Sequence, residues 1–451
     1  MKSRTLEKGI MRQTFRMAWP AVIESLFSAL TSFVDTLMVS ALGANAVAAV
    51  GLISQPRLMG LALFLALGVA SSAVIARRYG EGRRDSANTT LLTTILFSSV
   101  AAVIVTLVFV FGADGIIRFC GSSESTHEMS VQYLKIVMGG ISFQCMQMVI
   151  NSSQRGAGNT RITMITNLIA NSLNVVFNYL LIGGKFGFPA LGVRGAAIAT
   201  VLGYAVSFTI SVASLFRKEQ FLSVYYIIRE KIRPSWEAFL SLCKFGYSIF
   251  IEQLLMRIGM SATAIMAAKT GDNSMAAHQV CMNVLTFSYA FGDGLQAAAV
   301  ALIGRSLGEK NPERAKAYGK ACQTYGLMIS IGLALVYFLA ADWIMGLFFP
   351  GQMHIIKIGR YIMWVVIPIV LVQIRQVIYM GSLRGAGDTF FTAIVAVLSV
   401  TILRTSVSYL FGFGLHWGII GVWMGIFADQ LGRFVASYFR FRSGKWTTIR
   451  V

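Results

Sequence analysis

The chain consists of long apolar segments separated by short polar segments, and this pattern continues from one end to the other. An α-helix needs about 20 mostly apolar residues to cross the hydrocarbon core of a bilayer. Strands of a membrane β-barrel would instead alternate apolar and polar residues. The pattern predicts an all-α membrane protein with twelve transmembrane helices, near residues 14–39, 50–76, 90–112, 131–154, 162–183, 195–216, 240–268, 276–303, 321–341, 359–382, 390–411 and 417–439.

The composition agrees with a membrane protein. Hydrophobic residues make up 56% of the chain and charged residues 13%, and the mean hydropathy is +0.67. Soluble domains are roughly 45–50% apolar and about 25% charged. The net charge of +20 could suggest nucleic-acid binding, but the basic residues lie in short loops between apolar segments. We therefore expect a lipid bilayer and a small-molecule substrate as partners, and no nucleic acid.

The loop charges predict the orientation. Lysine and arginine residues collect in alternate loops, for example at 2–16, 77–84 and 217–233, whereas the opposite loops carry few of them. The positive-inside rule places the basic loops in the cytoplasm, and both termini with them. The N-terminal cations lead directly into a long span with no small-residue cleavage site, so we expect no cleavable signal peptide.

The two halves of the chain resemble each other. A shift of 228 residues places Glu24 on Glu252, and a shift of 229 places RGAGNT at 155–160 on RGAGDT at 384–389. Each half has an even number of spans, so both enter the membrane in the same sense. We predict two pseudo-symmetric six-helix lobes, residues 1–216 and 240–451, related by an axis along the membrane normal and joined by a cytoplasmic linker at 217–239. Such lobes can bind substrate near the midplane and work by alternating access.

Asp35 is the clearest candidate for ion coupling, because it lies in the apolar run FSALTSFVDTLMVSALG. A charge within a span is costly, by about 2.5–3.5 kcal/mol on insertion scales. Burial disfavours the charged form of a carboxyl group, so such an acid can load and release a proton near neutral pH. Asp35 could also be an interfacial acid that reaches outward to water.

Amide side chains form stripes on three predicted helices. Helical spacing places those of the fifth span on one face, where they could line a cavity and face Asp35 or Na⁺, or could simply join helices. The fourth and tenth spans carry further amides, which suggest that both lobes line one substrate path, although helix packing is an equally good interpretation. These residues are Asn167, Asn171, Asn174 and Asn178 in the fifth span, Gln144, Gln147, Asn151 and Gln154 in the fourth, and Gln373 and Gln376 in the tenth.

The C-terminal half carries intramembrane charges of both signs, which are Glu252, Asp293, Asp429, Arg257, Arg375, Arg404 and Arg433. Unpaired charges would be costly there, so we expect most of them to be paired. The excess of arginine leaves room for an anionic substrate group, and we include Glu252 and Arg375 in the candidate substrate path. Pro20 lies in the first span, where proline removes a helix hydrogen bond, so it is either a hinge or a static bend.

Several catalytic and binding motifs are missing from the sequence. It has no GxxxxGK[ST], no HExxH and no GxSxG. Its five cysteines make no CxxC pair and no metal-ligand spacing. We therefore expect neither an enzyme nor a cofactor or metal centre.

The chain resembles the multidrug and toxic compound extrusion family. The resemblance rests on VDTLMV with Asp35-Thr36, on GDNSMAAHQV at 271–280 and on the paired RGAG loops, and it covers nearly the whole chain. It implies a two-lobe antiporter in the inner membrane of a bacterium, which exports cationic and amphipathic drugs in exchange for H⁺ or Na⁺. We expect a monomer.

The resemblance also implies residue roles. Asp35 matches the coupling acid of the first span and Asn174 an asparagine near it, whereas Asn178 stands where many members of the damage-inducible branch carry a second acid. The two acids of the norfloxacin-exporter branch fall at Met256 and Gln373, so the cation site of that branch is missing. Glu252-Gln253 is similar to the damage-inducible branch. The resemblance therefore favours H⁺ coupling in the N-terminal lobe.

Two other functions fit the sequence less well. A flippase or exporter of an anionic lipid-linked or conjugated substrate would be favoured by cavity-facing arginines, for which Arg257, Arg375 and Arg404 are candidates. A membrane-embedded enzyme would need a nucleophile–base pair or a metal cluster among the polar residues of the spans, and the sequence offers neither.

Overall fold

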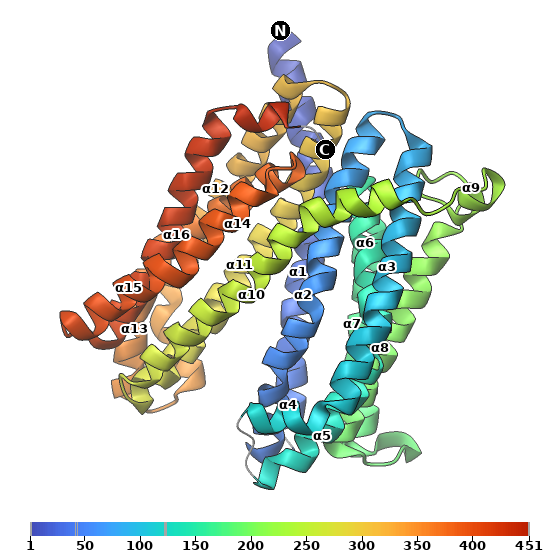
Figure 1. Cartoon of the computed structure of the whole chain (residues 1–451). Helices are drawn as coiled ribbons and strands as arrows, with labels where there is room; N and C mark the ends of the chain where they lie inside the picture. Colours follow the sequence, from blue (N-terminus) through green and yellow to red (C-terminus); the bar gives the residue numbers. More distant parts are fainter. Residues whose placement is uncertain (1, 41, 43, 121–123, 450–451) are drawn as a thin grey trace. The chain divides into compact units, whose positions relative to one another are not determined.

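The computed structural model describes the backbone at residues 2–40, 42, 44–120 and 124–449. In these residues every regular element is helical and no β-strand is present (Figure 1). A helix pairs its own backbone groups, which is what a chain in lipid requires. The predicted all-α membrane fold is confirmed.

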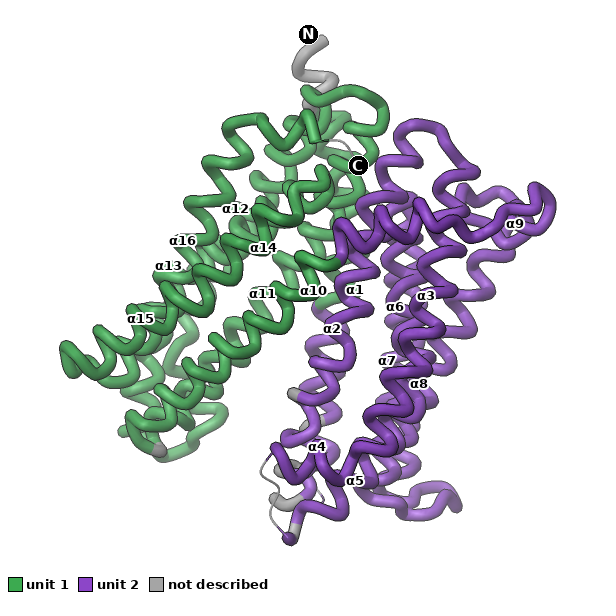
Figure 2. The backbone as a smooth tube through the Cα atoms, viewed as in Figure 1, with its two compact units in different colours: residues 1–25, 247–451 green, residues 26–246 purple. Residues whose placement is uncertain are grey.

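The helices form two compact units, shown in different colours in Figure 2. Unit 2 contains residues 26–246, and unit 1 contains residues 1–25 together with 247–451. Two helices pass from one unit to the other, α1 (Lys2–Ser40) and α10 (Trp236–Ala268). The segment predicted to link the lobes lies within unit 2, and the lobe boundaries drawn from the sequence repeat remain a prediction.

The other elements follow in chain order. Unit 2 contains α2 (Ala44–Gly80), α3 (Arg84–Phe111), α4 (Ala113–Phe119), α5 (Glu124–Gly139), α6 (Ile141–Gly156), α7 (Thr160–Gly183), the 3-10 turn η1 (Lys185–Gly187), α8 (Gly192–Leu215) and α9 (Val224–Arg229). Unit 1 contains α11 (Asp272–Gly308), α12 (Pro312–Phe348), α13 (Met353–Gly385), α14 (Thr389–Val397), the π-helix η2 (Leu398–Leu403), α15 (Arg404–Tyr409), the π-helix η3 (Leu410–Gly414), α16 (Gly418–Arg442) and the 3-10 turn η4 (Lys445–Thr448).

Each of the twelve predicted spans lies on one of these helices or on a broken series of them. By length and composition, ten of the described helices can cross a membrane, or eleven if α5 and α6 are one span with a 45° bend. The bend falls at Gly140, where a Cβ atom would lie 2.4 Å from Cγ1 of Val201. α11 covers the predicted span 276–303 but is not among these ten, and it carries His278 and Asp293 within the predicted span.

Each unit has its own buried apolar core, and each also exposes large apolar side chains. Val100, Ile104 and Leu107 on α3 and Leu335 and Leu339 on α12 are examples. Soluble monomers rarely expose large contiguous apolar surfaces, whereas a bilayer solvates them. The exposed apolar side chains therefore agree with a lipid-facing surface.

The sequence repeat is visible as repeated local geometry. In both RGAG loops the second glycine has a positive φ, +85° at Gly158 and +94° at Gly387, in the region that glycine adopts at little cost. The next residue donates its N–H to the carbonyl five residues earlier, at 2.9 Å in both loops. The same turn therefore ends α6 in unit 2 and α13 in unit 1.

The first glycine of each RGAG loop permits a close helix contact. A Cβ atom on Gly156 would lie 2.4 Å from the carbonyl oxygen of Ser72, and one on Gly385 would lie 2.6 Å from that of Val300. Ser72 and Val300 are themselves 228 residues apart. The repeat therefore conserves the close approach of α6 to α2 and of α13 to α11.

Candidate functional site

Unit 2 contains a partly open cavity of about 560 Å³ between α1, α2, α5, α6, α7 and α8. This volume lies within the range of sites for small organic ligands, roughly 300–1,000 Å³. Most lining side chains are polar, although the cavity lies within a bundle of apolar helices. The lining residues are Ser28, Thr31, Ser32, Asp35, Val39, Val50, Gly51, Ser54, Arg57, Tyr133, Gln144, Gln147, Asn167, Ala170, Asn171, Asn174, Asn178, Ala196, Thr200, Gly203 and Tyr204.

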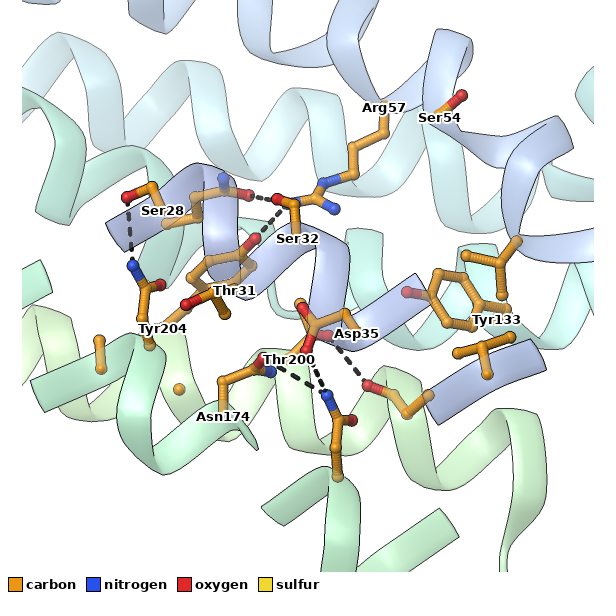
Figure 3. Close-up of a pocket in the computed structure, with 18 of the residues that line it drawn as sticks. Ser28, Thr31, Ser32, Asp35, Ser54, Arg57, Tyr133, Asn174, Thr200 and Tyr204 are labelled. Carbon is orange, nitrogen blue, oxygen red and sulfur yellow. Dashed lines mark hydrogen bonds between the residues drawn. The ribbon is translucent and has the colours of Figure 1, made fainter. Parts of the chain in front are cut away.

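Asp35 lies on α1 and faces two asparagines of α7 (Figure 3). The amide nitrogen of Asn178 donates to Oδ1 of Asp35 at 2.7 Å. The hydrogen-bond network turns the amide nitrogen of Asn174 toward the same carboxylate, at 2.9 and 3.1 Å from its two oxygens, while the Asn174 oxygen accepts from the backbone N–H of Thr200 at 3.2 Å. The structure thus brings together Asp35, Asn174 and Asn178, as the sequence predicted.

Four of the other predicted amides of α6 and α7 also lie at this cavity, namely Gln144, Gln147, Asn167 and Asn171. Asn171 donates to Oγ of Ser28 at 3.1 Å, and Gln147 donates to Oδ1 of Asn167 at 2.7 Å. Gln144 lines the cavity as well. On each helix, the spacing of the amides places them on one face. The amide face of α7 is turned toward α1.

Arg57 on α2 is a cavity residue that the sequence analysis did not single out. Its guanidinium donates to the hydroxyl of Tyr204, and its Nη2 lies 3.4 Å from Oε1 of Gln144. Among the described lining residues, Asp35 is the only acid and Arg57 the only base. A signal was present in the sequence, because Arg57 is a cation inside the predicted span 50–76.

Asn151 and Gln154 on α6 do not line this cavity. Asn151 accepts from Oγ of Ser211 at 2.9 Å, and Gln154 donates to Oγ of Ser214 at 3.2 Å. Both side chains therefore join α6 to α8, and the substrate-path role of Asn151 remains a prediction.

The predicted pairing of intramembrane charges is confirmed for Glu252 and Asp429 in unit 1. Nη2 of Arg384 lies 2.5 Å from Oε1 of Glu252, and Glu252 is 2% exposed. Oδ2 of Asp429 lies 2.8 Å from Nη2 of Arg433 and 3.9 Å from Nε of Arg404. Arg384 had been placed in a loop from the sequence, whereas the structure places it at the C-terminal end of α13 as a buried counter-ion.

The predicted path residues of the tenth span lie on α13. Gln373 and Gln376 are buried. Nε of Arg375 lies 3.3 Å from Oε1 of Gln323, and its guanidinium lies 5.0 Å from the ring centre of Phe434. These contacts are internal to unit 1, and the substrate-path role of Gln373, Gln376, Arg375 and Glu252 remains a prediction.

The chain matches a known protein family in both halves of its sequence. The MatE family profile matches residues 20–180 and again residues 248–410, once in each half of the sequence repeat. The chain belongs to the MatE family. It is therefore a multi-pass membrane transporter with the two-lobe fold of that family and not an enzyme.

Curated relatives match this MatE-family chain over nearly its whole length. A "Probable multidrug resistance protein NorM" of Thermotoga maritima is 26% identical over 97% of this chain and 93% of the relative. A protein of the same name from Bacillus cereus is 29% identical over 94% of both chains. An "Uncharacterized transporter YisQ" of Bacillus subtilis is 26% identical over 99% of this chain and 97% of the relative.

Solved structures share the fold of the MatE-family chain. One is described as "Outward-facing conformation of a multidrug resistance MATE family transporter of the MOP superfamily", with a TM-score of 0.89, 22% identity and 97% coverage of both chains. Another, described as "Crystal structure of MATE in the bent conformation", has a TM-score of 0.85 and 23% identity over 99% of this chain and 97% of that chain.

Pro20 lies within α1 of the MatE-family chain, and α1 is one continuous helix from Lys2 to Ser40. Proline has no N–H, so the helix lacks one hydrogen bond at this turn. The boundary between the two units falls a few residues later, between Ser25 and Leu26. The hinge role of Pro20 remains a prediction.

Proposed function

We propose that the chain is a secondary active exporter of amphipathic organic compounds, driven by inward H⁺ movement through Asp35. Asp35 is the one carboxylate among the described lining residues of a ligand-sized cavity, and amide nitrogens surround it. The relatives named as multidrug resistance proteins support this substrate class.

The amide contacts give Asp35 a protonation-dependent role. A carboxylate accepts hydrogen bonds at both oxygens, whereas a protonated carboxyl group is itself a donor. Protonation of Asp35 at Oδ2 would therefore set an O–H against the amide nitrogen of Asn174, which lies 3.1 Å from this oxygen, so this contact must break or turn. The loaded and unloaded forms of Asp35 thus favour different arrangements of α1 and α7, which alternating access requires.

The same contacts favour H⁺ over Na⁺ as the coupling ion. A hard cation such as Na⁺ needs several oxygen ligands, as Ca²⁺ and Mg²⁺ do. Asn178 presents its amide nitrogen to Asp35, and the hydrogen bonds around Asn174 are satisfied when its nitrogen faces Asp35 as well. The contact from Asn178 is the single observation that carries the choice of ion.

One carboxyl group is sufficient to drive export. Moving one proton inward through 100 mV supplies about 2.3 kcal/mol. At about 1.4 kcal/mol per tenfold, this supports a gradient of about 40-fold for a neutral substrate before any pH difference is added. A second acid at position 178 is therefore not required.

We further propose that both termini are cytoplasmic, that the chain lies in the inner membrane of a bacterium, and that it works as a monomer. The loop charges support the orientation. All the described residues that line the cavity belong to unit 2 of one chain, which supports a monomer. No cofactor beyond the coupling ion is part of this proposal.

The alternative, a flippase or exporter of anionic conjugates, relied on Arg257, Arg375 and Arg404. Arg404 lies beside Asp429, and Arg375 beside Gln323. Arg404 is thus close to an acid, and neither Arg404 nor Arg375 is among the lining residues of the cavity, which makes this alternative the weaker one.

The test is dye efflux from proteoliposomes under an imposed pH gradient. Asp35→Asn keeps the shape of the side chain and removes its titration, so gradient-driven efflux is lost while the protein stays folded. Asp342→Asn is the matched control, because Asp342 is half exposed and pairs with Arg360 away from the cavity. Equal efflux by wild type and Asp35→Asn would remove Asp35 from the mechanism, and efflux driven only by a Na⁺ gradient would overturn the choice of H⁺.

A further inference from the structure

The cavity of unit 2 contains a cation that the proton cycle does not use. Arg57 enters from α2, and Figure 3 shows its side chain pointing toward Tyr204. Its guanidinium lies 5.6 Å from the ring centre of Tyr204 and donates to the Tyr204 hydroxyl. The other contact is the long one, 3.4 Å, to Gln144. Both acceptors are neutral.

Asp35 is not the counter-ion of Arg57. The two groups interact electrostatically across the cavity, but none of the salt bridges among the described residues includes Arg57. The Asp35 carboxylate already accepts hydrogen bonds from Asn174 and Asn178. The charge of Arg57 is therefore not neutralised by a direct contact.

Arg57 also has an unused donor. Its Nε is buried and has no hydrogen-bond partner among the described residues. A buried donor without a partner costs about 1–3 kcal/mol, more when the group is charged. A guanidinium binds a carboxylate through two parallel N–H donors, with a geometry that lysine cannot reproduce. A planar anion in the cavity would neutralise the charge, and a turn of the guanidinium toward it would also give the buried Nε an acceptor.

We propose that Arg57 binds an anionic group of the substrate, so that the cavity selects compounds with a carboxylate beside a cationic centre. The proposal rests on the proposed proton exchange at Asp35 and adds the substrate class. The cationic centre of the substrate binds near Asp35 and competes with the proton for it, which the exchange of substrate for H⁺ requires. An anion without a cationic centre would bind best when Asp35 is protonated and would travel with the proton, against the direction of export. A cation without the carboxylate would leave Arg57 unpaired.

The test is fluorescence polarisation with a matched pair of dyes and the purified full-length protein. Tetramethylrhodamine is a zwitterion with a free carboxylate, and its methyl ester is a cation of nearly the same size. A hydrogen bond to a charged group contributes about 1.5–3 kcal/mol, so wild type should bind the zwitterion roughly 10-fold to 100-fold more tightly than the ester.

Variants show whether Arg57 binds the carboxylate of the substrate or has only a structural role. Arg57→Gln should bring the ratio of the two affinities to about one, through weaker binding of the zwitterion, while the ester binds as well as before or better. Arg57→Lys should keep part of the preference, because the charge remains. Tyr204→Phe should reduce the preference less than Arg57→Gln does, because it removes only an acceptor that positions the guanidinium. Arg194→Gln is the control, since Arg194 bonds to Gln132 away from the cavity.

Wild type that shows no preference for the zwitterion, including wild type that binds neither dye, would overturn the proposal. An unchanged preference in a folded Arg57→Gln protein, with a wild-type thermal midpoint, would do so as well. Should Arg57→Gln not fold, a partial reduction of the preference in both Arg57→Lys and Tyr204→Phe supports the proposal, and an unchanged preference in both overturns it. Equilibrium binding uses no ion gradient, so this result stands apart from the Asp35→Asn efflux experiment and can fail while proton exchange holds.

Discussion

The amide nitrogen of Asn178 on α7 lies 2.7 Å from the carboxylate oxygen Oδ1 of Asp35 on α1. Asn178 is 2% exposed, whereas Asp35 is half-buried and lines the cavity. A donor of this kind stabilises the charged form of the carboxyl group. The contact therefore links the charge state of Asp35 to the packing of two helices.

Replacing this donor should change the pH dependence of export. Asn178→Leu removes a hydrogen bond to a charged group, worth about 1.5–3 kcal/mol, so the pH at half-maximal gradient-driven efflux should rise by about one to two units. Asn174→Ala should act in the same direction, and both variants should still be driven by the gradient. A pH profile of efflux that matches wild type in both variants would contradict this role for the two asparagines.

Breaking the buried ion pair in unit 1 should destabilise the protein. Glu252→Ala or Arg384→Ala leaves one buried charge without its partner, which costs about 3–5 kcal/mol. The double variant Glu252→Leu with Arg384→Met should recover much of this loss, because it buries no charge. Thermal unfolding of the purified variants in detergent provides the measurement. Single variants that unfold at the wild-type temperature would show that the pair is not needed for stability.

The two repeat-related glycines should each be intolerant of alanine. A Cβ atom at Gly156 or Gly385 would lie 2.4 or 2.6 Å from a backbone oxygen of the neighbouring helix, and overpacking of this kind costs about 1–3 kcal/mol. Gly332 on α12 has no atom within 4 Å of such a Cβ, so Gly332→Ala should instead stabilise the helix, by up to about 1 kcal/mol. Thermal midpoints should therefore fall in the first two variants and hold or rise in the third.

Cysteine labelling should reveal the orientation in the membrane. In a background without the native cysteines, Phe186→Cys should react with an impermeant maleimide from outside the cell, and Ile228→Cys only after the membrane is opened. Phe186 is 86% exposed in η1 and Ile228 is 70% exposed in α9. Labelling of position 228 alone from outside would reverse the proposed topology.

Much of the fold follows from apolar length, because a span in lipid has few alternatives to a helix. The pairing of Asp35 with the asparagines of α7 was also predictable, since residues three and four apart share a helix face. Helical periodicity does not show which neighbouring helix the polar face contacts. Asn151 therefore fits the same stripe as Gln144 and Gln147 but bonds to Ser211 on α8.

The pairing of Arg384 with Glu252 was out of reach of the sequence patterns. Arg384 follows Glu252 by more than a hundred residues, and no local rule pairs an arginine in a glycine loop with a carboxylate inside a span. Arg57 is different, because a cation in the predicted span 50–76 is unusual on composition alone. Proline often ends a helix, but the neighbouring Pro56 lies inside α2, and Arg57 therefore stays within the helix and not in a loop.

The division of the chain between the two units has a consequence for biosynthesis. Unit 2 is contiguous in sequence, so it can assemble as soon as residue 246 has left the ribosome and entered the membrane. Unit 1 needs residues 1–25, which are made before unit 2, and residues 247–451, which are made after it. The first part of α1 must therefore wait through the synthesis of an entire unit before its partners exist.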